Sequence, residues 1–284
     1  MTPLEITETM VRTGFAPRPA DSHKGTYGHI LSLCGSYGMS GAAYFAAKSA
    51  LRCGAGLVTA AIPESIYPIV AAQLPEAVYC PLHEDLDHAL IVEDSHSIVA
   101  CLQKATSAVV GCGFGKCEKS MQLLKDFFEM RGSLPTVLDA DGLNWLATLP
   151  EIPESILQAD PLTLCVTPHP MEMARLLGTN VEVIQEDRVS CAETLAENLH
   201  AVVVLKGHRT IIAAEGFPTL INPTGCSGMS TGGTGDVLAG MIASFAAQGM
   251  SLYNAAIAGV SMHSDSRICC RYNKDCNDKG LRCS

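Results

Sequence analysis

A glycine-rich turn that carries a carboxylate is the part of this sequence best suited to chemistry. Residues 231–240 read Thr-Gly-Gly-Thr-Gly-Asp-Val-Leu-Ala-Gly, and the pattern predicts an apolar helix that begins near Thr234. Exposed N–H groups of such a turn, together with the helix dipole, attract anions such as phosphate. Asp236 then fits a general base that takes a proton from a hydroxyl while the turn steadies a transferring phosphoryl group. The alternative, a carboxylate that caps free N–H groups in the first helical turn, remains open.

Motifs of other common enzyme classes are incomplete. Residues 111–116 resemble a phosphate-binding P-loop, but Val110 stands where the first glycine is needed and Cys117 where a Ser or Thr is needed. Lys116 occupies the third glycine position of a dinucleotide fingerprint. Residues 83–88 contain one residue too many for a zinc-binding HExxH motif, and the chain has no G-x-S-x-G elbow. These observations exclude the commonest NTPase, zincin and hydrolase classes.

Short apolar runs that alternate with helical patterns must position the glycine-rich turn. Strands are predicted at 29–33, 57–62, 107–111, 136–139, 162–167, 201–206, 210–214 and 219–221, and helices at 42–53, at 64–74 and from about 234 and 252. This alternation is typical of parallel βαβ units, which bind ligands at the carboxyl ends of their strands. We therefore predict a single α/β domain over residues 1–284, with helices on both faces of the sheet. Its functional loops should follow Leu33, Val110, Leu138, Val166 and Lys206.

Composition and charge limit the class of protein further. The chain has 284 residues, of which 48% are hydrophobic and 17% charged, so it can bury a large core. A formal net charge of −10 argues against a protein that wraps nucleic acid. The chain begins without the pattern of a signal peptide and has no apolar run long enough for a membrane span, which predicts a soluble, cytoplasmic protein. Nine of its thirteen cysteines, from Cys34 to Cys226, lack paired spacing and are interpreted as buried free thiols.

The run 231–236 resembles the Gly-Thr-Gly-Asp anion hole of ribokinase-like enzymes. Four further segments narrow the resemblance: His-Lys-Gly-Thr-Tyr-Gly at 23–28 leading into 34–43, Val-Leu-Asp-Ala-Asp-Gly-Leu-Asn at 137–144, Thr-Pro-His-Pro-Met-Glu at 167–172 and Leu-Lys-Gly-His-Arg-Thr at 205–210. In this order the chain resembles the ADP/ATP-dependent NAD(P)H-hydrate dehydratases, the stand-alone form of the carboxyl domain of bifunctional repair enzymes. The resemblance covers roughly residues 15–263 and implies a ribokinase-like, three-layer α/β/α sandwich with a mainly parallel central sheet.

The resemblance implies an activity and a nucleotide site. Such enzymes repair NADH and NADPH hydrated at carbon 6 of the nicotinamide ring (NADHX and NADPHX), using ADP or ATP to phosphorylate the hydroxyl before phosphate is expelled. Asp236 would be the catalytic base and part of the substrate site, and the N–H groups of Gly233, Thr234 and Gly235 would form the anion hole. The nucleotide would bind Gly235 and the turn formed by Lys206, Gly207, His208, Arg209 and Thr210. From the pattern alone, that turn is equally compatible with a plain hairpin.

Three residues match the family's contacts to the hydrated dinucleotide. His169, held extended between two prolines, would hydrogen-bond a sugar or phosphate of the substrate, although a lone histidine is also compatible with a structural role. Ala42 and Gly113 would permit close approach, or would simply serve helix packing and a turn. Mg²⁺ is the expected cofactor; Glu172 and Asp141 are candidates to orient its bound water, but Glu172 is equally suited to cap its own helix, and the ligands stay open.

The expected partners are small molecules, with neither nucleic acid nor membrane among them. Stand-alone members of the family generally use ADP, which favours ADP over ATP here. The family also implies a homotetramer that works beside a separate NAD(P)H-hydrate epimerase. Two alternatives remain: a small-molecule kinase of the same fold acting on a thiazole or pyrimidine alcohol, and a non-catalytic nucleotide-binding regulator.

The last twenty residues depart from the family pattern. Cys269, Cys270, Cys276 and Cys283 lie among basic and polar residues, with a spacing that is not typical of a zinc site. Our hypothesis is a reading frame shifted after about Asp265, and resequencing the locus tests it. An intact frame with the same cysteine codons would contradict the hypothesis.

Overall fold

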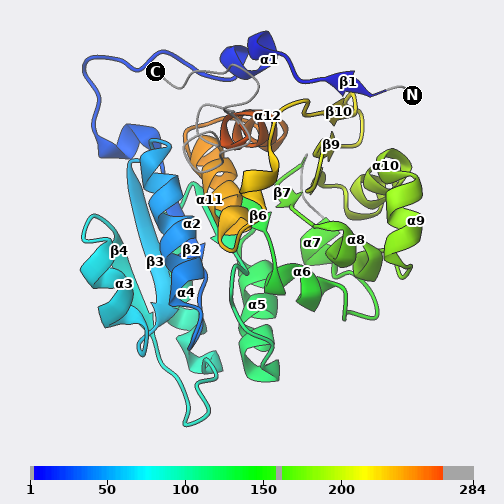
Figure 1. The fold of residues 1–284 in the computed structure, drawn as a ribbon. Helices are drawn as coiled ribbons and strands as arrows, with labels where there is room; N and C mark the ends of the chain where they lie inside the picture. Colours follow the sequence, from blue (N-terminus) through cyan, green and yellow to red (C-terminus); the bar gives the residue numbers. More distant parts are fainter. Residues whose placement is uncertain (1–2, 158–161, 265–284) are drawn as a thin grey trace.

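A twisted, largely parallel β-sheet forms the centre of the computed structural model, which describes residues 3–157 and 162–264. Its strands are β1 (Leu4–Glu5), β2 (His29–Leu33), β3 (Leu57–Pro63), β4 (Val78–Leu82), β5 (Ser107–Val110), β6 (Thr136–Leu138), β7 (Leu164–Val166), β8 (Val202–Leu205), β9 (Ile211–Ala213) and β10 (Leu220–Ile221). Within the described ranges they follow the order β1-β10-β9-β8-β7-β6-β5-β2-β3-β4, and β9 runs antiparallel to both of its neighbours (Figure 1). The carboxyl ends of β2, β5, β6, β7 and β8 therefore share one edge of the sheet.

Two layers of helices cover the faces of this sheet. The helices are α1 (Glu8–Thr13), α2 (Ser40–Arg52), α3 (Tyr67–Gln73), α4 (Ser95–Leu102), α5 (Glu118–Met130), α6 (Asp141–Leu146), α7 (Glu154–Leu157), α8 (Pro170–Leu176), α9 (Val181–Glu186), α10 (Arg188–Leu199), α11 (Thr234–Ala247) and α12 (Leu252–His263). Buried side chains of α2, α3, α11 and α12 form one core, and those of α4 to α10 form a second core on the other face. Both faces of the central strands, β2, β3 and β5 to β9, are buried, as in parallel sheets generally. The predicted three-layer α/β/α fold is confirmed.

Small residues bring the glycine-rich turn to the sheet. A Cβ at Gly240 of α11 would lie 2.2 Å from the carbonyl oxygen of Ala46, so α11 packs against α2 with almost no side chain between them. Ala43, Ala47 and Ala50 are fully buried on the same face of α2. This close packing holds the first turn of α11 beside the carboxyl ends of the central strands.

The predicted bounds of β2 and the predicted first residues of α11 and α12 are correct, whereas other predicted elements differ by one to three residues. The helix expected at 64–74 begins only at Tyr67, because Pro63 still pairs with Leu82 in the sheet and residues 64–66 form a turn. The predicted strands at 107–111, 136–139, 162–167, 201–206, 210–214 and 219–221 are shorter by one to three residues.

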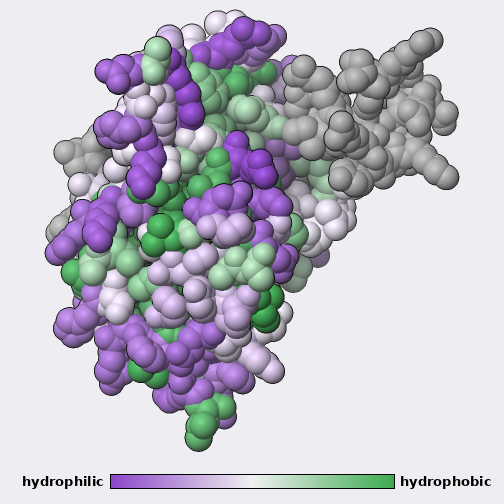
Figure 2. All heavy atoms as spheres, turned by 90° about the vertical axis from the view of Figure 1, so that its left-hand side faces the viewer, coloured by the Kyte–Doolittle hydropathy of each residue, from purple (hydrophilic) through white to green (hydrophobic). Residues whose placement is uncertain are grey.

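Strand β4 was not expected from the sequence, and it forms one edge of the sheet. Figure 2 shows this side of the molecule, where hydrophobic side chains are scattered among polar ones. Tyr67, Ile69 and Val78 are exposed there. Pro81 of β4 has no N–H group, and this limits further strand pairing at the edge.

Among the described helices, none combines the length and the apolar character that crossing a bilayer needs. The cysteine-rich tail, and with it the hypothesis of a shifted frame after Asp265, lies outside the residues that the structure describes.

Candidate active site

Four side chains from separate segments meet at the carboxyl edge of the sheet. Cys112 follows β5, Asp139 follows β6, Lys206 follows β8, and Asp236 lies in the first turn of α11. One ligand atom each of Cys112, Asp139 and Asp236 lies within 4.8 Å of the others. The predicted base therefore lies where parallel strands place ligands.

The glycine-rich turn opens α11 in a conformation that needs glycine. Gly233 has φ = +87°, in the left-handed region, and a Cβ there would lie 2.7 Å from the ring of Phe45. The Thr234 hydroxyl donates a hydrogen bond to the carbonyl oxygen of Thr231 at 2.8 Å, which closes the turn. The first N–H groups of a helix lack intrahelical acceptors, and those of Thr234 and Gly235 are among them. Their role in holding an anion stays a prediction.

The carboxylate of Asp236 has the surroundings of a base rather than of a helix cap. The thiol of Cys112 lies within 4.8 Å of it, and the described start of α11 has no side-chain cap hydrogen bond. Burial and the neighbouring negative charge of Asp139 raise the pKa of Asp236 to about 6, against the opposing effects of the Cys112 thiol and the Lys206 ammonium. A carboxylate with this pKa is ionised at neutral pH and binds a proton more tightly than an ordinary aspartate.

If Asp236 is the base, activity must fall when Asp236 is protonated. Because the ionised form is required, kcat/KM should be flat above about pH 7 and should fall about tenfold per pH unit below its pKa of about 6. The measurement is the pH profile of kcat/KM for the reaction proposed below. A profile that stays flat down to about pH 5 would contradict this assignment.

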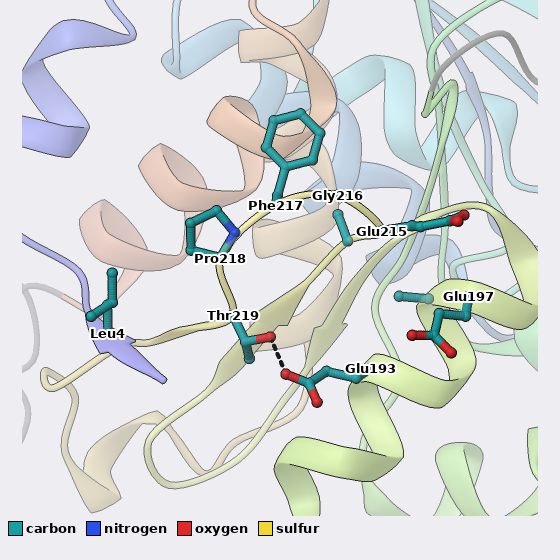
Figure 3. A pocket seen from close by; sticks show the side chains of 10 residues that line it. Leu4, Glu193, Glu197, Glu215, Gly216, Phe217, Pro218 and Thr219 are labelled. Atoms are coloured by element: carbon teal, nitrogen blue, oxygen red, sulfur yellow. Dashed lines mark hydrogen bonds between the residues drawn. The ribbon is translucent and has the colours of Figure 1, made fainter. Parts of the chain in front are cut away.

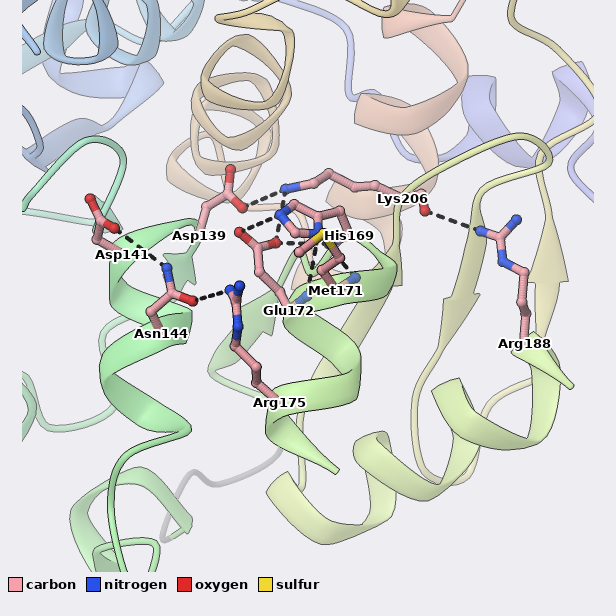
Figure 4. Close-up of polar contacts among 9 residues, drawn as sticks. All are labelled: Asp139, Asp141, Asn144, His169, Met171, Glu172, Arg175, Arg188 and Lys206. Carbon is pink, nitrogen blue, oxygen red and sulfur yellow. Dashed lines mark hydrogen bonds and ion pairs between the residues drawn. The ribbon is translucent and has the colours of Figure 1, made fainter. Parts of the chain in front are cut away.

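Lys206 joins two buried carboxylates. Its Nζ lies 2.6 Å from Oδ1 of Asp139 and 3.8 Å from Oε2 of Glu172. Figure 4 shows Lys206 extending across the ends of the strands to reach both. The two carboxylates raise the pKa of Lys206, although its burial acts in the opposite direction. The ammonium therefore stays charged and keeps a positive charge beside the glycine-rich turn.

His169 and Glu172 form a reciprocal cap at the start of α8. Nδ1 of His169 accepts hydrogen bonds from the N–H groups of Met171 and Glu172 at 3.2 Å each, and the N–H of His169 donates to Oε2 of Glu172 at 2.8 Å. Both residues thus have the structural roles that the sequence left open. The imidazole is half-exposed at the same edge of the sheet, so its predicted contact to substrate stays a prediction.

Ala42, in the first turn of α2, lies against Gly113, in the loop after β5, where that loop meets the loop after β2. Gly113 has φ = +57°, and a Cβ there would lie 2.6 Å from the Cβ of Ala42. The Ser36 hydroxyl donates to the carbonyl oxygen of Gly113 at 2.8 Å, and the N–H of Gly115 donates to Oδ2 of Asp141 at 3.0 Å. The two loops therefore form one wall beside the glycine-rich turn, and the role of Ala42 and Gly113 in substrate binding stays a prediction.

The turn from Lys206 to Thr210 is the loop of a β-hairpin, because β8 and β9 are antiparallel. The Thr210 hydroxyl donates to the carbonyl oxygen of Gly207 at 3.0 Å. Arg209 has φ = +56°, and its side chain is ion-paired with Glu5 at 2.9 Å, while His208 is exposed. A Cβ at Gly235 would lie 3.6 Å from Nζ of Lys206, so the hairpin and the glycine-rich turn face each other. The predicted nucleotide-binding residues are thus together, and their role in binding stays a prediction.

Comparison with known proteins identifies the family. The chain matches the family model Carb_kinase, described as NAD(P)H-hydrate dehydratase, over residues 30–275. The chain belongs to the NAD(P)H-hydrate dehydratase family. The family predicted from the sequence motifs is therefore confirmed.

Individual members of the family are similar over most of the chain. The bifunctional NAD(P)H-hydrate repair enzyme Nnr of Moorella thermoacetica is 41% identical over 258 residues, 91% of this chain and 48% of the relative. The ADP-dependent (S)-NAD(P)H-hydrate dehydratase of Neisseria meningitidis is 38% identical over 250 residues, 88% of this chain and 79% of the relative. Among solved structures, the fold is similar to that of the ADP/ATP-dependent NAD(P)H-hydrate dehydratase from Bacillus subtilis, co-crystallised with ATP/Mg²⁺, with a TM-score of 0.76. The two sequences are 30% identical, and the match covers 94% of this chain and 90% of that chain. This chain spans about half the length of its bifunctional relatives.

Several site residues of this family member were not assigned from the sequence. Asp139 and Cys112 were read only as parts of longer motifs, although Asp139 holds Lys206 and Cys112 contacts Asp236. His263, at the end of α12, lies near Thr234 and Lys206, and burial lowers the pKa of this imidazole. An acidic residue at the carboxyl end of the predicted strand 136–139 was a usable signal for Asp139, since such positions lie at the ligand edge.

Among the oxygen donors of this dehydratase-family site, Asp139 fits Mg²⁺ best, because Asp236 must stay free to accept a proton. Mg²⁺ is usually held through one or two carboxylates together with substrate phosphates. Oδ1 of Asp139 is paired with Lys206, and its Oδ2 lies 3.4 Å from the Cβ position of Gly235 in the glycine-rich turn. The earlier candidates are already engaged: Asp141 accepts hydrogen bonds from Gly115 and Asn144, and Glu172 caps α8. A bound Mg²⁺ would supply charge neutralisation to the phosphates of the nucleotide.

A separate groove with acidic side chains lies near the amino ends of the central parallel strands, away from their carboxyl ends. It has a volume of about 640 Å³ and is lined by Glu193, Glu197, Glu215, Phe217 and Pro218, among others (Figure 3). It lies beyond the end of β9, where Ala213 pairs with Val203 near the start of β8. The groove is therefore distinct from the site around Asp236.

Proposed function

We propose that this protein dehydrates NADHX and NADPHX to NADH and NADPH in a reaction that consumes ADP or ATP. The observation that carries the proposal is the position of Asp236, a carboxylate with a raised pKa in the first turn of a helix that opens on an anion-binding turn. The family assignment, and relatives named ADP-dependent (S)-NAD(P)H-hydrate dehydratase, support the same activity. We further infer that residues 1–284 form one catalytic domain.

The first step transfers a phosphoryl group to the 6-hydroxyl of the hydrated ring. Asp236 takes the proton of this hydroxyl, and the hydroxyl oxygen attacks the terminal phosphorus of the nucleotide. The N–H groups of Gly233, Thr234 and Gly235 hold the negative charge that develops on the transferred group, and the Lys206 ammonium adds positive charge close by. An aligned donor of this kind typically lowers the barrier by about 2.7–4 kcal/mol.

The second step eliminates the phosphate. Phosphate is a better leaving group than hydroxide, so the bond between carbon 6 and oxygen breaks with the electron pair leaving on phosphate. A proton then passes from the neighbouring ring carbon to water, which restores the double bond. The net products are NAD(P)H, inorganic phosphate and AMP when ADP is the donor.

Donor, partners and location follow from the relatives as proposals. We favour ADP as the donor, because that nucleotide is named for the Neisseria meningitidis relative of similar length. The bifunctional relatives support a separate epimerase that works beside this protein. A homotetramer and a cytoplasmic location remain predictions of the family resemblance.

The test is the near-ultraviolet absorbance of the reduced nicotinamide ring, which NADH has and NADHX lacks. Purified protein is mixed with NADHX, Mg²⁺ and either ADP or ATP, with AMP in place of the donor as the control. We expect a rise in absorbance that requires ADP or ATP. A folded protein that binds nucleotide but produces no rise would contradict the dehydratase and favour the small-molecule kinase.

A further inference from the structure

Arg188 directs its guanidinium group into the hairpin turn that joins β8 and β9. It is the first residue of α10, and Figure 4 shows it reaching the backbone at Lys206 from a separate helix. Its Nη1 donates to the carbonyl oxygen of His208 at 2.6 Å. Its Nη2 donates to the carbonyl oxygens of Leu205 and Lys206, at 3.1 Å each. One side chain thus holds three of the carbonyl groups at positions 205–208 on one side of the turn.

The orientation of these carbonyls fixes the orientation of the N–H groups that follow them. In a planar trans peptide the C=O and N–H bonds point in opposite directions. The peptide after Leu205 shows the effect, because its N–H, on Lys206, donates to the carbonyl oxygen of Pro168 at 2.8 Å. The other two peptides place the N–H groups of Gly207 and Arg209 on the side away from Arg188. Neither of these two groups has an acceptor within the described part of the chain.

We propose that Arg188 is a positioning residue for nucleotide binding. It holds the turn so that the N–H groups of Gly207 and Arg209 donate to a phosphate of bound ADP, without contacting the nucleotide itself. The hydrogen bond from Arg188 to the carbonyl oxygen of Lys206 also fixes the backbone of Lys206, whose side chain reaches Asp139. This inference rests on the proposed function, because it takes the turn to be the nucleotide site.

The residue types at both ends of this contact suit it. Only arginine presents several donors in a rigid planar fork, so one guanidinium can bind three carbonyl oxygens that a lysine ammonium could not span in the same way. Gly207 has φ = +135°, and a Cβ there would lie 3.1 Å from Nη2 of Arg188. Glycine therefore permits both the backbone conformation and the close approach of the guanidinium.

The experiment compares ADP with adenosine, which lacks the phosphates, by calorimetric titration of the wild type, Arg188→Lys and Arg188→Ala. We expect the affinity for ADP to fall about tenfold to a hundredfold in Arg188→Ala and less in Arg188→Lys, because charge-assisted hydrogen bonds that orient the donors are lost. Adenosine affinity should change less than about twofold, since its contacts do not need the oriented N–H groups. Millimolar guanidinium ion should restore ADP binding to Arg188→Ala.

Arg131 provides a matched control, because it binds backbone carbonyls at the amino ends of the strands, away from the nucleotide-binding turn. Its Nη1 also donates to backbone carbonyls, those of Leu134 at 3.0 Å and Thr163 at 3.2 Å, which precede β6 and β7. Arg131→Lys should lower the melting temperature and leave ADP affinity unchanged. Equal losses of ADP and adenosine affinity in Arg188→Ala, or unchanged ADP affinity, would overturn the proposal. A wild type that binds no ADP would contradict the proposed function itself.

Discussion

Replacement of Asp236 by Asn is expected to lower kcat by roughly 10²–10⁴-fold, the usual contribution of a positioned general base. Asn keeps the shape of the side chain but cannot accept the proton of the 6-hydroxyl. The anion-binding turn is built from backbone groups, so ADP affinity should stay within about twofold of the wild type. The measurements are single-turnover formation of NADH and calorimetric titration with ADP. Turnover that stays undiminished would rule out Asp236 as the base.

The same variant should gain stability at neutral pH. The pKa of Asp236 is raised in the folded protein to about 6, so the folded state binds a proton more tightly than the unfolded state. Stability is therefore lost as pH rises from the ordinary aspartate pKa to about 6, and the full cost is present above that pH. Asn removes this cost, so the midpoint of urea unfolding at pH 7 should shift to a higher urea concentration. The control is Asp21→Asn, at an exposed position, which should leave that midpoint nearly unchanged. A variant that is both inactive and less stable would indicate a structural role instead.

The sheet and the position of the site edge were predictable because they follow from local patterns. Continuous apolar runs such as 202–205 are typical of strands buried on both faces, and parallel strands place their following loops at one edge. Two site residues could be recognised beside glycines at the ends of predicted elements. Lys206 ends a predicted strand and precedes Gly207, and Asp236 follows Gly235 at the start of a predicted helix. The structure places both residues at that edge.

The remaining site residues depend on tertiary contacts that no local pattern records. Asp139 and Asp141 follow the same strand, two positions apart, yet only Asp139 contacts Lys206 while Asp141 binds the neighbouring loop at Gly115. The positive φ of Ala140, +51°, lies between them and separates their directions. Arg188 begins an amphipathic helix, where an arginine usually faces solvent, and only the folded hairpin reveals its carbonyl partners.

Replacement of Lys206 by Met is expected to destabilise the protein by about 3–5 kcal/mol, because it leaves buried carboxylates without their cation. Asp139 is 1% exposed and Glu172 is 5% exposed, so water cannot replace the ammonium. Urea unfolding at neutral pH measures the effect. The matched control is Lys119→Met, which breaks an ion pair with Asp85 at the surface and should change stability little.

Adding Asp139→Asn to Lys206→Met tests whether the loss of stability comes from the carboxylate of Asp139, which the first change leaves without its cation. The double variant should recover much of the lost stability, because the carboxylate closest to the missing ammonium is gone. The single variant Lys206→Met should also move the acid limb of the kcat/KM profile to higher pH, since Lys206 opposes the rise in the pKa of Asp236. A variant that loses stability but keeps the acid limb near pH 6 would show that Lys206 supports the fold without acting on the base. The two readouts together distinguish an ammonium that only balances buried charge from one that also keeps Asp236 ionised at neutral pH.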